Sequence, residues 1–148
     1  MLKKIFLFLA FTFPFLLAAQ EDTTVLLLDD LQFDVQSVKV NKDTAIVDLF
    51  VISSLRQQRE FKMNTYASTL VDQKDNDILY TQIKMCRVRI HIDDRQNYLH
   101  YILSMDVPVS LQFKVAGWKK ENGLPQAVKI VFEDSREPGR FRQITVRL

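Results

Sequence analysis

The stretch HIDDRQNYLH contains both histidines of the chain, His91 and His100. In strands with alternating side chains, His91 and Asp93 share one polar face, and His100 lies on the polar face of the next strand. A loop over Asp94–Asn97 is suited to closing a hairpin between these strands. That register places His91 opposite His100, close enough for both imidazoles to bind one metal ion such as zinc, with Asp93 as a third ligand. A metal-binding protein or a metal-dependent hydrolase is therefore one hypothesis.

The alternative is a solvated hairpin tip with two exposed histidines. Arg89 lies on the same predicted face and repels a cation, and no residues that would orient the histidines are evident. The sequence has no Ser-His-Asp order, paired-carboxylate motif or glycine-rich phosphate loop, and only three glycines in all. These observations favour a protein that is not an enzyme.

Two further groups carry possible chemistry. Cys86 falls on the apolar face of the predicted hairpin, which favours a buried, unreactive thiol over a nucleophile. Asp72, Asp75 and Asp77 concentrate oxygen ligands that suit Ca²⁺, although polar turns have the same composition and Lys74 lies among them. Both a calcium site and an ordinary turn remain open.

Trp118 stands between Gly117 and Lys119 in a polar segment. An exposed indole at this position is a platform for a sugar ring or a protein partner. The alternative is a tryptophan that closes one end of a hydrophobic core.

Most of the chain alternates between polar and apolar residues with a period of two, and helical periodicity is nearly absent. A change of phase between Val35 and Val38 predicts a bulge or a bend between sheets, and the apolar run AIVDLFVIS predicts a strand at the centre of a sheet. The segment Leu55–Asn64 fits either a loop or a short helical turn. The other predicted strands contain the sequences QIKMCRVRIHI, YLHYILSM, VPVSLQFKV, AVKIVFED and FRQITVRL.

This pattern predicts an all-β protein: an antiparallel, immunoglobulin-like β-sandwich of about 7–9 strands. We expect one domain over residues 21–148, because that length supports a single core. Cys86 is the only cysteine, so the core has no internal disulfide.

The first 20 residues have the layout of a cleaved signal peptide. Lys3 and Lys4 precede an apolar core, Ala18 and Ala19 follow it, and the chain then becomes polar. The core is too short to span a bilayer, and no cysteine stands near the cleavage point for lipid attachment. The prediction is an exported protein, periplasmic or extracellular, that is not a lipoprotein and has no stable transmembrane anchor.

Without Lys3 and Lys4, basic and acidic residues are equal in number. A nucleic-acid partner is not expected, because such partners require a concentrated positive surface.

The signal peptide followed by VDLFVIS, LVDQKDNDILY, VPVSLQFKV and FRQITV resembles the secreted immunoglobulin-like β-sandwich modules of bacterial cell envelopes. Such modules often carry an Asp-x-x-Gly-Asn turn, where this chain has Asp75 in place of the glycine. The resemblance implies no catalytic residue and no cofactor. The sequence therefore predicts a non-catalytic exported module that binds a protein or a glycan of the cell envelope or has a structural role there, with the metal-dependent hydrolase as the alternative.

Overall fold

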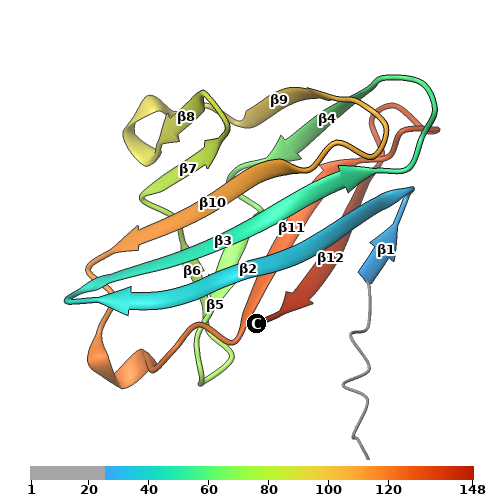
Figure 1. Cartoon of the computed structure of the whole chain (residues 1–148). Coiled ribbons are helices and arrows are strands. Elements are labelled where there is room, and N and C mark those ends of the chain that lie inside the picture. The colour runs from blue at the N-terminus through green and yellow to red at the C-terminus, as the bar shows by residue number, and fades with distance from the viewer. Residues whose placement is uncertain (1–25) are drawn as a thin grey trace, which may run out of the picture.

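The computed structural model describes residues 26–148, which form two antiparallel six-stranded sheets packed face to face. Figure 1 shows β2, β3 and β10 running side by side over β11 and β12. The strands of sheet A, in spatial order, are β1 (Leu26–Leu28), β2 (Leu31–Asn41), β3 (Thr44–Ser53), β10 (Val109–Ala116), β7 (Gln82–Met85) and β8 (Val88–His91). Sheet B contains β6 (Asp77–Leu79), β5 (Thr69–Val71), β11 (Ala127–Glu133), β4 (Arg59–Asn64) and β9 (Tyr98–Leu103), with β12 (Phe141–Arg147) on the other side of β11. Two short 3-10 helices, η1 (Ile92–Asp94) and η2 (Lys120–Asn122), lie in the connections.

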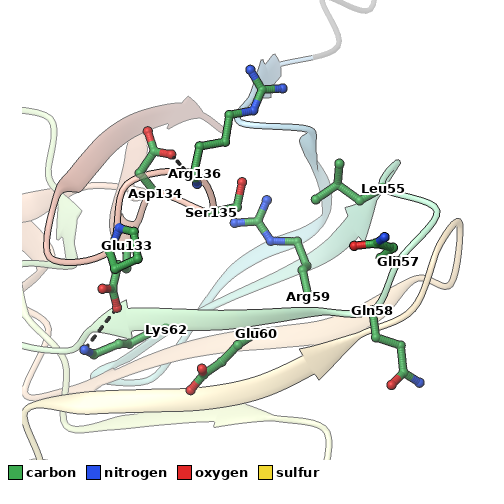
Figure 2. Close-up of a pocket in the computed structure, with 11 residues that line it drawn as sticks. Leu55, Gln57, Gln58, Arg59, Glu60, Lys62, Glu133, Asp134, Ser135 and Arg136 are labelled. Carbon is green, nitrogen blue, oxygen red and sulfur yellow. Dashed lines mark hydrogen bonds and ion pairs between the residues drawn. The ribbon is translucent and has the colours of Figure 1, made fainter.

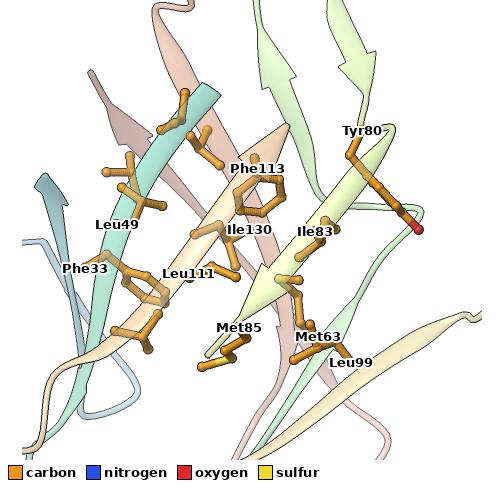
Figure 3. Close-up of a cluster of buried hydrophobic side chains, with 14 of the residues drawn as sticks. Phe33, Leu49, Met63, Tyr80, Ile83, Met85, Leu99, Leu111, Phe113 and Ile130 are labelled. Atoms are coloured by element: carbon orange, nitrogen blue, oxygen red, sulfur yellow. The ribbon is translucent and has the colours of Figure 1, made fainter. Parts of the chain in front are cut away.

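The core fills the space between the sheets, because alternate residues of each strand point inward. Leu49 and Phe113 come from sheet A and Ile130 and Met63 from sheet B, and all four are fully buried (Figure 3). Aromatic contacts join the sheets as well: the ring centroids of Phe33 and Phe132 are 5.9 Å apart. One continuous core holds the described residues together.

Several predictions from the alternating pattern are confirmed. The structure is all-β, consistent with a β-sandwich. The pairing of β2 with β3 is irregular between Val35 and Ser37, where a bulge or a bend was predicted. β3 lies between β2 and β10, so the apolar run AIVDLFVIS is a central strand.

The predicted hairpin around the histidines is wrong. The segment QIKMCRVRIHI folds back on itself, because Met85 pairs with Val88 across a turn at Cys86 and Arg87. The chain then passes through η1 from sheet A to sheet B, where β9 pairs with β4. Cys86 occupies the turn with a left-handed φ of 49°, a conformation usually given to glycine or asparagine. The residue types at this position therefore gave no indication of a turn.

The segment Leu55–Asn64 contains a strand, β4, where a loop or helical turn was expected. Phe61 and Met63 point inward and Lys62 outward, but the inward position before them holds a charged residue, Arg59, which hides the alternation. Short strands such as β1, β5 and β6 also raise the number to twelve, above the predicted 7–9.

Within residues 26–148, no helix is long and apolar enough to cross a membrane. The predicted signal peptide over residues 1–20 lies outside the described residues.

Candidate functional site

The outer face of sheet B carries the most chemically diverse surface of the described residues. Alternation in β4 points Glu60 and Lys62 outward, and in β9 it does the same for Tyr98 and His100. Phe141 and Glu133 are paired across β12 and β11 and also face outward. Cationic, anionic and aromatic side chains therefore meet on one face.

A hollow opens at one end of this face because β4 leaves β11. All six residues of β4 pair with β9, but only Met63 pairs with β11, opposite Phe132. The hollow has a volume of about 440 Å³. Figure 2 shows Lys62 and Glu133 on one side of it and Leu55 and Gln57 on the other. We call it the Arg59 hollow, after the residue at its base.

Arg59 is only 5% exposed and forms an ion pair with Asp29, at 3.0 Å between Nη2 and Oδ2. Its Nη1 donates to the backbone carbonyl of Asp29 at 2.5 Å, and its Nε has no acceptor among the described residues. Ser135 donates to Asp29 through its backbone N–H and its hydroxyl. Burial acts to raise the pKa of Asp29, but the hydrogen bonds from Ser135 and Arg59 outweigh it and lower that pKa. The pair holds three segments together: the β1–β2 turn, β4 and the β11–β12 loop.

Beside the hollow, Lys62 is surrounded by groups that favour its charge. Its Nζ is 3.0 Å from Glu133, 4.6 Å from the centroid of the Tyr98 ring and 5.7 Å from that of Phe141. The hydrogen bond to Glu133 raises the pKa of Lys62. The pKa of Glu133 is lowered mainly by a hydrogen bond from the backbone N–H of Gly139, and next by the hydrogen bond from Lys62. Lys62 and Glu133 are therefore held as a charged pair.

The two rings beside Lys62 stack on each other. The centroids of Tyr98 and Phe141 are 5.7 Å apart with an interplanar angle of 19°. His100 meets Tyr98 edge-on at 6.3 Å, and its Nδ1 lies 2.5 Å from Glu60 Oε1. We call Lys62, Tyr98, His100, Glu133 and Phe141 the aromatic–lysine cluster.

A second hollow, of about 570 Å³, lies at the opposite end of β11. Ala127 and Lys129 of β11 line it together with Thr145 and Arg147 of β12. Lys129 is 2.8 Å from Asp77 of β6, and this interaction lowers the pKa of Asp77. We call this the Lys129 hollow.

The predicted metal ligands do not come together as expected. His91 pairs with Gln82 in sheet A, whereas His100 pairs with Lys62 in sheet B. The prediction that the two histidines lie opposite each other is therefore wrong. The predicted metal site, which also included Asp93, loses its geometric basis. Among residues 26–148, no three His, Cys, Asp or Glu side chains are grouped so that they could hold a metal ion.

The acidic segment forms a turn, and its carboxylates already bond to other groups of the protein. Asp72 is buried and accepts hydrogen bonds from the backbone N–H groups of Lys74 and Asn76. Asp75 accepts from Gln126, and Asp77 pairs with Lys129. Asp75 has a left-handed φ of 63°, the conformation that a glycine at this position would provide.

Trp118 is 3% exposed, so it is not an exposed platform. Its Nε1 donates to the carbonyl of Gly123 and its backbone N–H donates to the carbonyl of Asp43. Trp118 therefore closes one end of the core, as the alternative prediction stated. Cys86 is half-buried beside the core, and not on a strand face as predicted.

Of the aromatic–lysine cluster, only His100 could be singled out from the sequence. Tyr98 and Phe141 are 43 positions apart, on strands that are not adjacent in sheet B. The pattern did contain a signal, because Tyr98 and Phe141 stand on the polar face of their strands, where a large ring is exposed unless a partner covers it.

A comparison of the chain with protein-family models, with curated proteins and with solved structures found no match. The fold and the site thus define an open antiparallel β-sandwich with one chemically elaborated outer face.

Proposed function

We propose that the chain is a non-catalytic binding module of the bacterial cell envelope, exported through its N-terminal signal peptide. Its recognition surface is the outer face of sheet B. The immunoglobulin-like relationship belongs to the same proposal. It is supported by two antiparallel sheets between which the chain crosses repeatedly, for example from β3 to β4 and from β8 to β9.

The observation that carries the proposal is the aromatic–lysine cluster. Tyr98 and Phe141 are half-buried rings on the outer face of sheet B. Aromatic side chains on a sheet surface provide a large contact area with little loss of conformational entropy on binding. Lys62, Glu133 and Glu60 surround them with hydrogen-bonding groups, as in a recognition site with an apolar centre and a polar rim.

The paired state of the charged groups favours binding over catalysis. A general acid or base is effective when its pKa lies near the working pH. On this face the pKa of Lys62 is raised and the pKa values of Glu133 and Asp77 are lowered, which moves all three away from neutrality.

The experiment is fractionation of the producing bacterium. We expect the protein in the envelope fraction, with a mature chain that mass spectrometry shows to begin near Gln20 or Glu21. The double variant Tyr98→Ser/Phe141→Ser should shift it to the soluble exported fraction. The control Phe50→Ser removes a half-buried ring from the outer face of sheet A and should leave the distribution unchanged. Circular dichroism establishes that both variants are folded.

Two results contradict the proposal. An intact Met1 on cytoplasmic protein would refute export. Retention of the folded double variant in the envelope at the level of the Phe50→Ser control would refute the recognition surface.

A further inference from the structure

The two hollows share one strand, and this suggests the shape of the ligand. Glu133 of β11 lines the Arg59 hollow, and Ala127 and Lys129 of the same strand line the Lys129 hollow. Six residue steps separate Ala127 from Glu133, which is about 20 Å in a strand. The outward residues between the hollows are Val131 and its partner Gln143. A linear ligand of several repeating units fits this path better than a compact one.

The charges along the path indicate that the ligand is neutral. Lys62 is paired with Glu133 and Lys129 with Asp77. In the Arg59 hollow, Arg59 is paired with Asp29, Arg136 with Asp30 and Asp134 with Arg142, and Glu60 lies 2.5 Å from the Nδ1 of His100. In the Lys129 hollow, Asp75 and Arg147 add one charge of each sign. A charged ligand would have to break one of these pairs, whereas hydroxyl groups can donate to the carboxylates and accept from the amines while the pairs remain.

The apolar side chains of this face have defined positions. Tyr98 and Phe141 lie next to Lys62, and Ile102, 56% exposed, is the large exposed hydrophobic residue of β9. A pair of stacked rings among polar groups suits the C–H surface of a sugar ring.

We propose that the ligand is an uncharged oligosaccharide chain of the cell envelope whose sugars carry vicinal hydroxyl groups, lying along β11 between the two hollows. Its sugar rings pack against Tyr98 and Phe141, and its hydroxyls bond to Lys62, Glu133, Lys129 and Gln143. This inference rests on the proposed function, because it names the ligand of the same surface.

The test is a sedimentation assay with protein purified from the producing bacterium and washed envelopes of that bacterium. Before mixing, the envelopes are treated either with periodate, which cleaves the vicinal diols of sugars, or with proteinase K. We expect periodate to reduce retention at least tenfold and proteinase to leave it unchanged. Retention should also be the same in 0.5 M salt as in about 0.1 M salt, because no net charge is neutralised on binding.

Other outcomes separate the two proposals. Loss of retention after proteinase but not after periodate would identify a protein partner, and retention that survives both treatments would identify a ligand without vicinal diols, such as a lipid. Either result overturns the oligosaccharide and leaves the binding module standing. No retention on untreated envelopes would overturn the proposed function itself.

A pair of matched variants places the ligand on the path. Gln143→Ala removes a polar side chain midway between the hollows and should weaken retention about fivefold, the effect of losing one hydrogen bond. Gln112→Ala is the same change on the outer face of sheet A and should have no effect. Equal retention of both variants would contradict the placement along β11.

Discussion

The buried ion pair at the base of the Arg59 hollow offers a sharp test of what holds this sandwich together. Asp29→Asn removes the negative charge and keeps the shape of the side chain. Asn tolerates the left-handed backbone at this position, where φ is 53°. Its carbonyl oxygen can still accept from Arg59 and from the backbone N–H of Ser135, and its amide can donate to the Ser135 hydroxyl. The loss of charge is thereby isolated from the loss of hydrogen bonds.

Both side chains of the pair are 3% exposed, so the positive charge of Arg59 would be left without a counter-charge in a largely desolvated site. Removing one partner of a buried ion pair typically costs about 3–5 kcal/mol. We expect about 3 kcal/mol, the lower end, because the hydrogen bond from Arg59 to the carbonyl of residue 29 remains. Urea denaturation followed by circular dichroism measures the change as a lower midpoint with the same m-value.

The neighbouring residue supplies the control. Asp30 is also left-handed, with φ 57°, and also pairs with an arginine, Arg136, but that arginine side chain is 77% exposed. Asp30→Asn should cost less than about 1 kcal/mol. In the double variant Asp29→Asn/Arg59→Met the stranded charge is gone, and much of the lost stability should return. A cost below about 1 kcal/mol for Asp29→Asn, or no recovery in the double variant, would refute the role assigned to this pair.

Three more predictions follow from packing, charge and backbone conformation. The pKa values of Asp29 and Asp134 are lowered in the folded state, so the stability that these residues contribute is present above their ordinary pKa of 3.8 and is lost as the pH falls below it. Urea denaturation at pH values from 7 to 2 should show this loss, and the decline should be smaller in Asp29→Asn. Phe113→Ala empties a fully buried position in a central strand and should cost about 3–5 kcal/mol in urea denaturation, and a loss below about 1 kcal/mol would contradict the packing. Lys42→Gly relieves a left-handed φ of 57° in the β2–β3 turn and should raise the midpoint of thermal unfolding, whereas Lys39→Gly, within β2, should lower it.

Much of sheet A could be predicted from the sequence because its strands obey local rules. Val47, Leu49 and Val51 alternate with half-exposed residues, and the turn at Lys42 and Asp43 joins two strands that are adjacent in both the chain and the sheet. The period of two depends only on the pleat of a strand. It therefore identified β2, β3, β10 and the irregularity in β2 without any information on distant contacts.

The error at the histidines shows where local rules end. Ile83 and Met85 stand at odd positions and Val88 and Ile90 at even ones, so the inward face changes phase across Cys86. The apolar residues after the turn fit a partner in either sheet equally well, because both sheets offer an apolar inner face. Which strand β9 pairs with is decided by the passage of the chain through η1 into sheet B.

The candidate site depends on the tertiary structure for the same reason. Lys62, Tyr98, Glu133 and Phe141 come from four strands whose sequence separations carry no common period. For Tyr98, Glu133 and Phe141 the sequence by itself determined that the side chain faces away from the core, since alternation is a property of one strand, whereas the strand that carries Lys62 was not predicted. Only the order of the strands in sheet B decided that they lie next to one another, because that order is set by long-range pairing and by which inner faces pack together in the core.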